Sequence, residues 1–228
     1  MISIIIPTLN EEKYIEATLE SIKNQNFKDF EVIVCDCHSN DKTIEIAKKY
    51  TDKIVFTETR STASARNTGA KYANGEYLIF LDADTMLSCN YLEKAHDIFK
   101  KAKYVGFSGA FKFSNKSLKY KITENAVNLA FIIFDFFRKT AIPGFNFCIP
   151  KPIFEKVGGF ENVFVEDINL FKKLGKLGKT KYFTHLYVIT SSRRLERQGI
   201  LKALDYYYDI GRKYGSAMDF SKRYIKVD

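Results

Sequence analysis

The chain has 228 residues, of which 46% are hydrophobic, and a formal net charge of +9. This length suits one α/β domain, and the hydrophobic fraction is sufficient for a core. The lysines are scattered and no nucleic-acid-binding signature occurs, so the positive charge favours phosphate-bearing substrates or an anionic membrane surface over nucleic acid. The first residues lack a basic leader, and four cysteines without a Cys-x-x-Cys pair indicate free thiols in a reducing compartment. We therefore expect a cytoplasmic protein.

The first half of the chain alternates between predicted strands and helices. Apolar runs predict strands at Ile2–Ile6, Glu31–Cys35, Lys53–Phe56 and Leu78–Leu81. Helices are predicted to begin after Asn10 as N-cap, after Ser39–Asp41, and at Ser64, the last ending at Ala73. Alternation of this kind predicts a doubly wound parallel sheet.

The second half is less regular. Helices are predicted at Asn90–Lys101, Lys116–Lys139, Asp167–Leu174 and Ile200–Tyr214, with a short helix from Pro152. Strands are predicted at Tyr104–Phe113, Phe145–Ile149 and Lys181–Thr190. No repeat, low-complexity tract or flexible linker interrupts the chain, so one domain is expected.

Two carboxylates, Asp82 and Asp84, follow the apolar strand Leu78–Leu81 with only Ala83 between them. In open α/β sheets, ligands bind at the carboxyl ends of the strands. Two acids in such a position repel each other unless a positive charge lies between them. A hard divalent cation with diphosphate oxygens as its other ligands fits this position. The alternative is a loop in which one aspartate caps the next helix.

Further polar residues are predicted to reach the same edge of the sheet. The segment Pro7–Glu11 follows the first strand, and Asp36 follows the second. Arg66 and Asn67 lie in the helix that precedes the Asp-Ala-Asp strand, and Glu166-Asp167 comes after a Gly-Gly-Phe turn.

Together and in this order, the segments IIIPTLNEE, EVIVCDCHSNDKT, ARNTGAKYANGEYLIFLDAD and GGFENVFVEDINL resemble the inverting nucleotide-sugar glycosyltransferases of glycosyltransferase family 2. The resemblance covers Met1 to about Arg197. It implies the GT-A fold, a Rossmann-like three-layer α/β sandwich with a mainly parallel central sheet. The single domain would comprise a nucleotide-binding half (about 1–100), an acceptor-binding half (about 101–197) and a C-terminal helical segment (about 198–228).

The resemblance also implies roles for individual residues. The donor-binding set would be Pro7, Thr8, Asn10, Glu11, Asp36, Arg66, Asp82 and Ala83. Asp84 would bind Mg²⁺ or Mn²⁺, and Asp82 would hold the ribose or a metal-bound water. Glu11 would lie near the ribose and Asp36 would face the base. For Arg66, a contact with carbonyls of the nucleotide or with a phosphate competes with a salt bridge on the helix surface.

An inverting transfer needs a carboxylate that takes the proton of the attacking acceptor, and the family places it at Asp167. The alternative is that Glu166-Asp167 only caps a helix. An acceptor phosphate would need no base, and Asp167 would then bind and orient it. Arg193 and Arg194 are expected to clamp the donor diphosphate, with a solvated basic loop as the alternative. The chain has no Trp, so the motif of processive polysaccharide synthases is absent.

The chain departs from the family after the second strand, where the common form has two adjacent acids. Here the order is Asp36-Cys37-His38-Ser39, and Cys37 replaces the acid that often reads a uracil ring. The nucleotide base of the donor therefore stays open.

The segment Val127–Phe137 is strongly apolar, but it is too short to span a bilayer and is interrupted by Asp135. Its flank, Arg138-Lys139, suits anionic head groups. Peripheral membrane contact and a polyprenyl-phosphate acceptor compete with a core or dimer-contact helix and a soluble acceptor sugar.

Two rival functions remain at this point. A nucleotidyltransferase has a related sheet and acidic metal site, but it needs a Gly-rich basic loop where this chain has PTLNEE. A non-catalytic carbohydrate- or lipid-binding protein could keep the fold. The acids Asp82, Asp84 and Asp167 argue against it.

Overall fold

The apolar run at the N-terminus forms an internal strand of the sheet. In the computed structural model, which describes residues 1–137, 143–161, 166–199 and 202, strand β1 (Ile2–Thr8) pairs in parallel with β2 (Phe30–Asp36) on one side. On the other side it pairs in parallel with β4 (Tyr77–Leu81), and β3 (Ile54–Phe56) extends the sheet beyond β2. The parallel sheet predicted for the first half of the chain is confirmed.

The second half adds strands of both directions to the same sheet. These are β5 (Thr85–Leu87), β6 (Gly106–Phe113), β7 (Asn146–Pro150) and β8 (Thr180–Thr190). The order is β3-β2-β1-β4-β7-β6-β8-β5. β7 runs antiparallel to both neighbours, β6 and β8 are parallel, and β5 is antiparallel to β8. Parallel pairings outnumber antiparallel ones, and the predicted fold class is confirmed.

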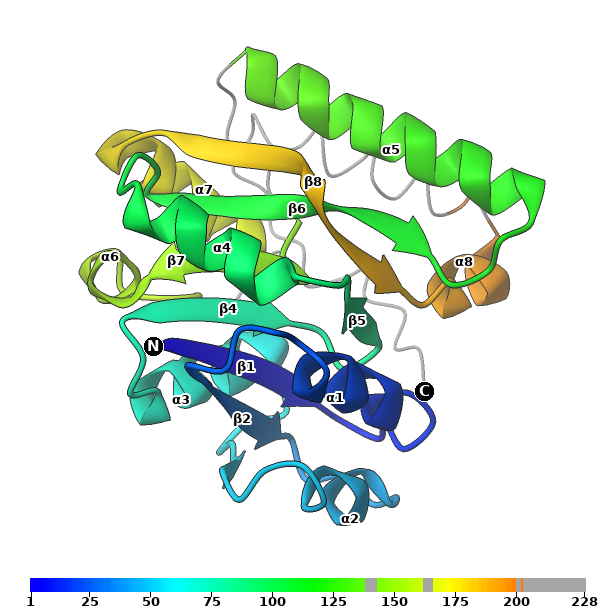
Figure 1. The fold of residues 1–228 in the computed structure, drawn as a ribbon. Helices are drawn as coiled ribbons and strands as arrows, with labels where there is room; N and C mark the ends of the chain where they lie inside the picture. The colour runs from blue at the N-terminus through cyan, green and yellow to red at the C-terminus, as the bar shows by residue number, and fades with distance from the viewer. Residues whose placement is uncertain (138–142, 162–165, 200–201, 203–228) are drawn as a thin grey trace.

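Helices cover both faces of the sheet and create three layers (Figure 1). On one face lie α1 (Ile15–Lys23), α4 (Tyr91–Lys100) and α5 (Leu118–Phe136). The other face holds α3 (Thr62–Tyr72), α6 (Lys151–Lys156) and α7 (Glu166–Leu177). Because side chains alternate along a strand, Ile4 and Ile6 pack in the first core and Ile5 in the second.

The loop after β1 differs from the prediction of a helix capped by Asn10. Helix α1 begins at Ile15, and Asn10 instead has a φ of 55°. The backbone N–H groups of Asn10 and Glu11 donate to the hydroxyls of Ser39 and Thr43, in and after the loop that follows β2. These long-range hydrogen bonds tie the two loops together and leave the helix to start one turn later.

Three short elements lie outside the clear sequence patterns. These are β5, with three residues, α8 (Arg193–Gln198), with six, and α2 (Thr43–Ala47), of which the sequence predicted only the start after Ser39–Asp41. β5 exists because β8 offers a pairing partner about a hundred residues later in the chain, which no local pattern reveals. Apart from residue 202, the helix predicted at 200–214 lies outside the described residues.

Helix α3 packs unusually close to the sheet. A Cβ atom at Gly69 would lie 2.4 Å from Cγ2 of Ile5 and 2.5 Å from Sγ of Cys35, so only glycine fits. Two positions earlier, the Asn67 amide donates to the carbonyl of Phe160 and accepts from its N–H, at 2.7 and 2.9 Å. Both contacts fix the place of Arg66, which directly precedes Asn67 in the helix, because the helix can neither lift from the sheet nor slide along it.

Candidate active site

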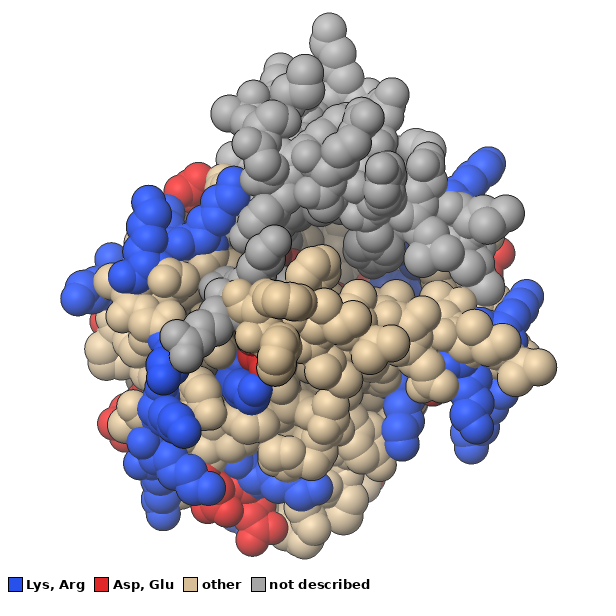
Figure 2. All heavy atoms as spheres, turned by 90° about the horizontal axis from the view of Figure 1, so that it is seen from above, with Lys and Arg blue, Asp and Glu red and all other residues tan. Residues whose placement is uncertain are grey.

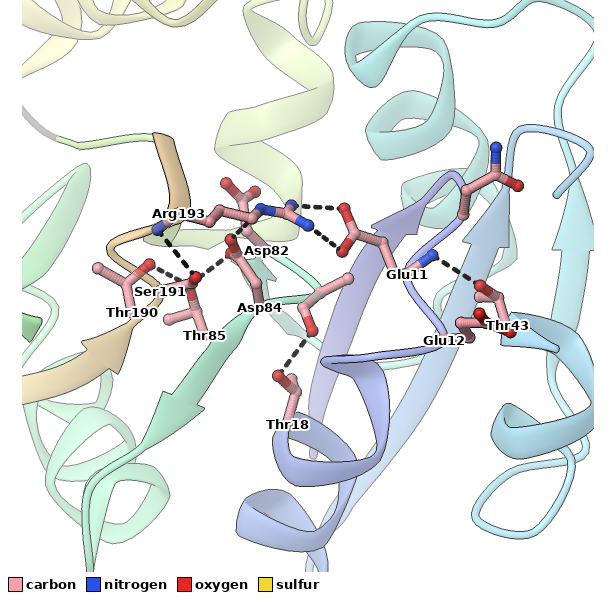
Figure 3. A network of polar contacts seen from close by, with 12 residues as sticks. Glu11, Glu12, Thr18, Thr43, Asp82, Asp84, Thr85, Thr190, Ser191 and Arg193 are labelled. Atoms are coloured by element: carbon pink, nitrogen blue, oxygen red, sulfur yellow. Dashed lines mark hydrogen bonds and ion pairs between the residues drawn. The ribbon is translucent and has the colours of Figure 1, made fainter. Parts of the chain in front are cut away.

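Loops from both halves of the chain meet at the carboxyl edge of β1, β2 and β4. Figure 3 shows acids from the loops after β1 and β4 beside Arg193, which starts α8 after β8. β5, paired with the end of β8, carries the second half of the chain to this edge. The pairing of β5 with β8 therefore explains why residues 84 and 193, far apart in the sequence, are neighbours.

Asp36 lies at the base of the two loops and has no exposed surface. Its carboxylate accepts from the Thr8 hydroxyl at 2.9 Å, and from the backbone N–H and hydroxyl of Ser39 at 2.7 and 2.6 Å. A buried carboxylate with several donors is stabilised as a structural anchor. The contacts that the sequence predicted for Thr8 and Asp36 with a nucleotide stay predictions, since here these side chains face each other.

The backbone of the Asp-Ala-Asp triplet is held from three directions. The carbonyl of Ala83 accepts from the Thr18 hydroxyl at 2.8 Å, and that of Asp84 from the N–H of Ser191 at 3.1 Å. The N–H of Asp82 donates to the carbonyl of Phe145 at 3.2 Å. The carboxylates thus project from a fixed turn, Asp82 more exposed (38%) than Asp84 (14%).

Arg193 joins the loop after β1 to the Asp-Ala-Asp turn. Its two terminal nitrogens donate to the two carboxylate oxygens of Glu11 at 2.6 and 2.7 Å. Its Nε lies 3.0 Å from Oδ2 of Asp84, and the guanidinium lies over the ring of Tyr14, 4.6 Å from the centroid. Glu11 and Arg193, both predicted donor-site residues, are therefore brought together with Asp84.

The electrostatics of Asp84 reflect this crowded acidic environment. Burial raises its pKa from the ordinary value of 3.8, and the neighbouring charges of Asp82 and Glu11 raise it further, while Arg193 opposes the rise. The outcome is a pKa of about 6. Burial and the two neighbouring acids together thus outweigh the effect of the Arg193 guanidinium on this pKa.

Arg66 is buried and pairs with one acid from each half of the chain. Its guanidinium donates to Oδ1 of Asp82 at 3.0 Å and to Oδ1 of Asp167 at 2.9 Å, and lies 5.2 Å from the Phe160 ring centroid. Arg66 does form salt bridges, but its side chain is buried, so the alternative of a salt bridge on the helix surface is wrong. The predicted contact of Arg66 with a nucleotide stays a prediction.

Asp167 lies in the first turn of α7, partly exposed and beside the loop that precedes β7. A Cβ atom at Gly144 would lie 2.0 Å from Oδ2 of Asp167, so the glycine makes room for the carboxylate. Asp167 therefore lies at the start of a helix and also contacts Arg66 at the edge of the site. The side chain of Glu166 is outside the described residues.

The remaining predicted residues lie around this edge. Pro7 pairs with Cys35 in the sheet, Asn10 is exposed and its side chain accepts from the N–H of Asn40, and Arg194 is exposed on α8. Sequence reasoning missed Tyr14, Thr18, Gly144 and Ser191. Their contacts are made across long sequence separations, and only Tyr14 and Thr18, close behind the Pro7–Glu11 motif, carried a local signal.

The acids suit a divalent cation whose coordination sphere would be completed by phosphate oxygens of a substrate. Within residues 1–137, 143–161, 166–199 and 202, no group of three or more His, Cys, Asp or Glu side chains forms a ready metal cage. Mg²⁺ sites, however, commonly use one or two carboxylates together with phosphate oxygens. Four carboxylates (Glu11, Asp82, Asp84 and Asp167) share the guanidiniums of Arg66 and Arg193 in these contacts. Asp82 and Asp84 therefore fit such a metal.

Sequence comparison places the chain among known transferases. The model of glycosyl transferase family 2 matches residues 3–160, more than half of the chain. Poly(ribitol-phosphate) β-N-acetylglucosaminyltransferase TarP of Staphylococcus aureus is 31% identical over 62% of this chain and 50% of its own length. The Escherichia coli UDP-Glc:α-D-GlcNAc-diphosphoundecaprenol β-1,3-glucosyltransferase WfgD is 32% identical over 51% and 48%. The chain thus spans about half the length of these relatives.

Solved structures show the same fold. S. aureus TarS in complex with UDP-GlcNAc superimposes with a TM-score of 0.67 at 22% identity, over 83% of this chain and 58% of TarS. The mannosyltransferase PcManGT of Pyrobaculum calidifontis, in complex with GDP-Man and Mn²⁺, gives a TM-score of 0.65 at 21% identity, over 82% and 56%.

The sheet order and these likenesses define the GT-A fold of nucleotide-sugar transferases. Within that class, the chain belongs to glycosyl transferase family 2. The family and the fold that the sequence motifs predicted are confirmed.

The raised pKa of Asp84 predicts how stability changes with pH. The folded protein binds this proton more tightly than the unfolded chain, so the destabilising effect is absent below about pH 4 and complete above about pH 6. Asp84→Asn should therefore raise the free energy of unfolding at pH 8 by on the order of 3 kcal/mol, and the gain should shrink as the pH falls through 6. Urea denaturation at several pH values measures this.

Asp97→Asn removes a carboxylate from the exposed side of α4 and serves as the control. An Asp84→Asn variant that is less stable than the wild type at pH 8 would contradict the prediction. It would mean that the ion pair with Arg193 outweighs burial and repulsion.

Proposed function

We propose that the protein transfers a sugar, with inversion, from a nucleoside-diphosphate sugar to an acceptor, with Mg²⁺ or Mn²⁺ at Asp84 and Asp82. The observation that supports this most is the single polar array from Glu11 through Arg193 and Asp84, and from Asp82 through Arg66 to Asp167. It brings the predicted donor acids and the predicted base to one edge. The complexes of TarS with UDP-GlcNAc and of PcManGT with GDP-Man and Mn²⁺ agree with this donor chemistry.

The donor half would bind the diphosphate. A divalent cation, when bound, supplies positive charge for the negative charge that grows on the leaving diphosphate. Arg193 adds a second cationic group, whose planar fork matches phosphate oxygens. Glu11, held by Arg193, would then contact the ribose.

The acceptor half would supply the base. Asp167 takes the proton of the acceptor hydroxyl while that oxygen attacks the anomeric carbon from the side opposite the diphosphate. Arg66 orients this carboxylate through Oδ1, and Oδ2 lies beside Gly144. For an acceptor phosphate, Asp167 would only bind and orient.

The acceptor is proposed to be lipid-linked, which the name of the relative WfgD supports. Helix α5 adds an observation of its own. Its inner side packs on β6 and β8 through Tyr120, Val127 and Phe131. Its outer side presents large apolar residues to solvent, namely Leu118, Ile122, Leu129, Ile132, Ile133 and Phe136.

These outer residues recur at helical spacing and make a second apolar stripe, with Phe136 80% and Leu118 72% exposed. One stripe is enough for the core, so the second is available for a partner. Lys116, Lys119 and Lys121 are exposed near its start, and Figure 2 looks down on a broad uncharged surface with Lys and Arg side chains around it. We propose that this stripe lies on an anionic membrane surface, where lipid-linked acceptors reside.

No helix in the described part of the chain is long and apolar enough to cross a bilayer. We propose that the contact is made from the cytoplasmic side of the membrane. Arg138-Lys139, expected to contribute, lies outside the described residues.

The two rival functions make different demands. A nucleotidyltransferase takes a nucleoside triphosphate and releases pyrophosphate, whereas the proposed enzyme releases a nucleoside diphosphate. A binding protein would not turn the donor over at all. Product analysis separates the three.

Donor and metal binding should depend on each other. UDP or GDP with Mn²⁺ should raise the melting temperature, because a ligand at a hundredfold excess over its Kd raises the free energy of unfolding by about 2.7 kcal/mol. EDTA should remove the shift, and so should Asp84→Ala, while Asp97→Ala should retain it. An equal shift in EDTA would show that the metal plays no part.

Loss of the base should separate binding from chemistry. Asp167→Asn should bind the donor nearly as well as the wild type but should release nucleoside diphosphate roughly 10²-fold more slowly in the presence of a lipid-extract acceptor. Gly144→Ala, which crowds the same carboxylate, should also slow the reaction. Turnover of Asp167→Asn within a few-fold of the wild type would leave it a helix cap or a binding group.

Membrane contact should depend on the outer stripe of α5. The protein should sediment with anionic vesicles at low salt, because each nearby lysine adds on the order of 1 kcal/mol. Phe136→Glu should weaken sedimentation, whereas Tyr72→Glu, at another solvent-exposed aromatic on α3, should not. Wild-type protein that remains in the supernatant with anionic and neutral vesicles alike would favour a soluble acceptor.

A further inference from the structure

We propose that Arg193 is a built-in counter-cation of the donor site, which pairs with Glu11 and Asp84 until the donor arrives and then releases Asp84 to the metal as it turns to the diphosphate. Metal and nucleotide would thereby bind as a coupled pair, and the metal alone would bind weakly. This inference rests on the proposed function and adds to it that metal and nucleotide bind together.

The guanidinium is engaged on three of its nitrogens. The terminal pair holds both carboxylate oxygens of Glu11, and Nε holds Oδ2 of Asp84. Bidentate, charge-assisted contacts of this kind are among the strongest that a side chain makes. Tyr14 covers one face of the group, which adds a cation–π contact to these ion pairs.

A metal at Asp84 must compete with this tethered cation. Oδ2 of Asp84 is in contact with Nε of Arg193, and the remaining oxygen, Oδ1, lies 3.4 Å from the Thr85 hydroxyl. Metal binding without a diphosphate would leave Arg193 with one anionic partner fewer. A bound diphosphate offers it new anionic oxygens, so diphosphate and metal each lower the free energy cost of binding the other.

The exchange requires only a side-chain rotation. The backbone before Arg193 is fixed to the Asp-Ala-Asp turn by the hydrogen bond from Ser191 to Asp84, and the Ser192 hydroxyl donates to Glu196 one turn along α8 at 2.7 Å. The Cα of Arg193 therefore stays at the rim while its long side chain changes partner. Such rotamer changes are fast compared with turnover.

The test measures Mn²⁺ binding to the full chain by the electron paramagnetic resonance signal of free Mn²⁺, with and without UDP or GDP. In the wild type, whichever of UDP and GDP binds to the protein should increase its affinity for Mn²⁺. Arg193→Gln should bind Mn²⁺ alone about tenfold more tightly, and the nucleotide in Mn²⁺ about tenfold more weakly, within the range usual for coupled sites. A residue with a merely structural role would weaken both.

Two further variants keep the test sharp. Arg197→Gln removes an exposed positive charge from the same helix and should change neither affinity. Arg193→Lys keeps the charge but loses the bidentate fork, so it should retain part of the coupling. It also reports on the site if the glutamine variant fails to fold.

The outcomes separate the two proposals. If the wild type binds Mn²⁺ and nucleotide but Arg193→Gln leaves Mn²⁺ binding unchanged or weaker, the counter-cation role is wrong and the proposed function stands. If the wild type binds no nucleoside diphosphate with Mn²⁺, both are wrong.

Discussion

Negative charge concentrated at one edge of the sheet is the constraint on which the rest of the site depends. The loops after parallel strands bring Glu11, Asp82 and Asp84 to the same end, and a partly buried edge cannot hold their charges without compensation. Arg66 on α3 and Arg193 on α8 supply the compensating positive charge. The pKa of Asp84, raised to about 6 by burial and by the neighbouring acids, shows that Arg193 does not offset these effects.

The two arginines differ in how firmly they are built in. Arg66 sits on a helix that Gly69 and Asn67 lock against the sheet and against the Phe160 turn, so its pairing with two carboxylates belongs to the fold. Arg193 extends from a six-residue helix at the rim and is partly exposed. Arg66 therefore fixes the geometry between Asp82 and Asp167, whereas the side chain of Arg193 has more room to move.

Most of the sheet could be predicted because its strands are buried on both faces and read as continuous apolar runs, as in Ile2–Ile6 and Leu78–Leu81. The direction of β7 and the existence of β5 could not, because both depend on partners distant in sequence. For the site, the motifs located the acids correctly at one edge. That Asp36 is an internal anchor and that Arg66 joins Asp82 to Asp167 follow only from packing, since a sequence does not say which polar group faces which.

The two apolar stripes of α5 have a consequence for how the protein behaves in solution. A face that carries Leu118, Ile122 and Phe136 in water is a site for self-association until a partner covers it. The surrounding lysines repel one another between copies, and salt screens that repulsion. Colloidal stability should therefore fall as ionic strength rises, and mild detergent should restore it by covering the stripe.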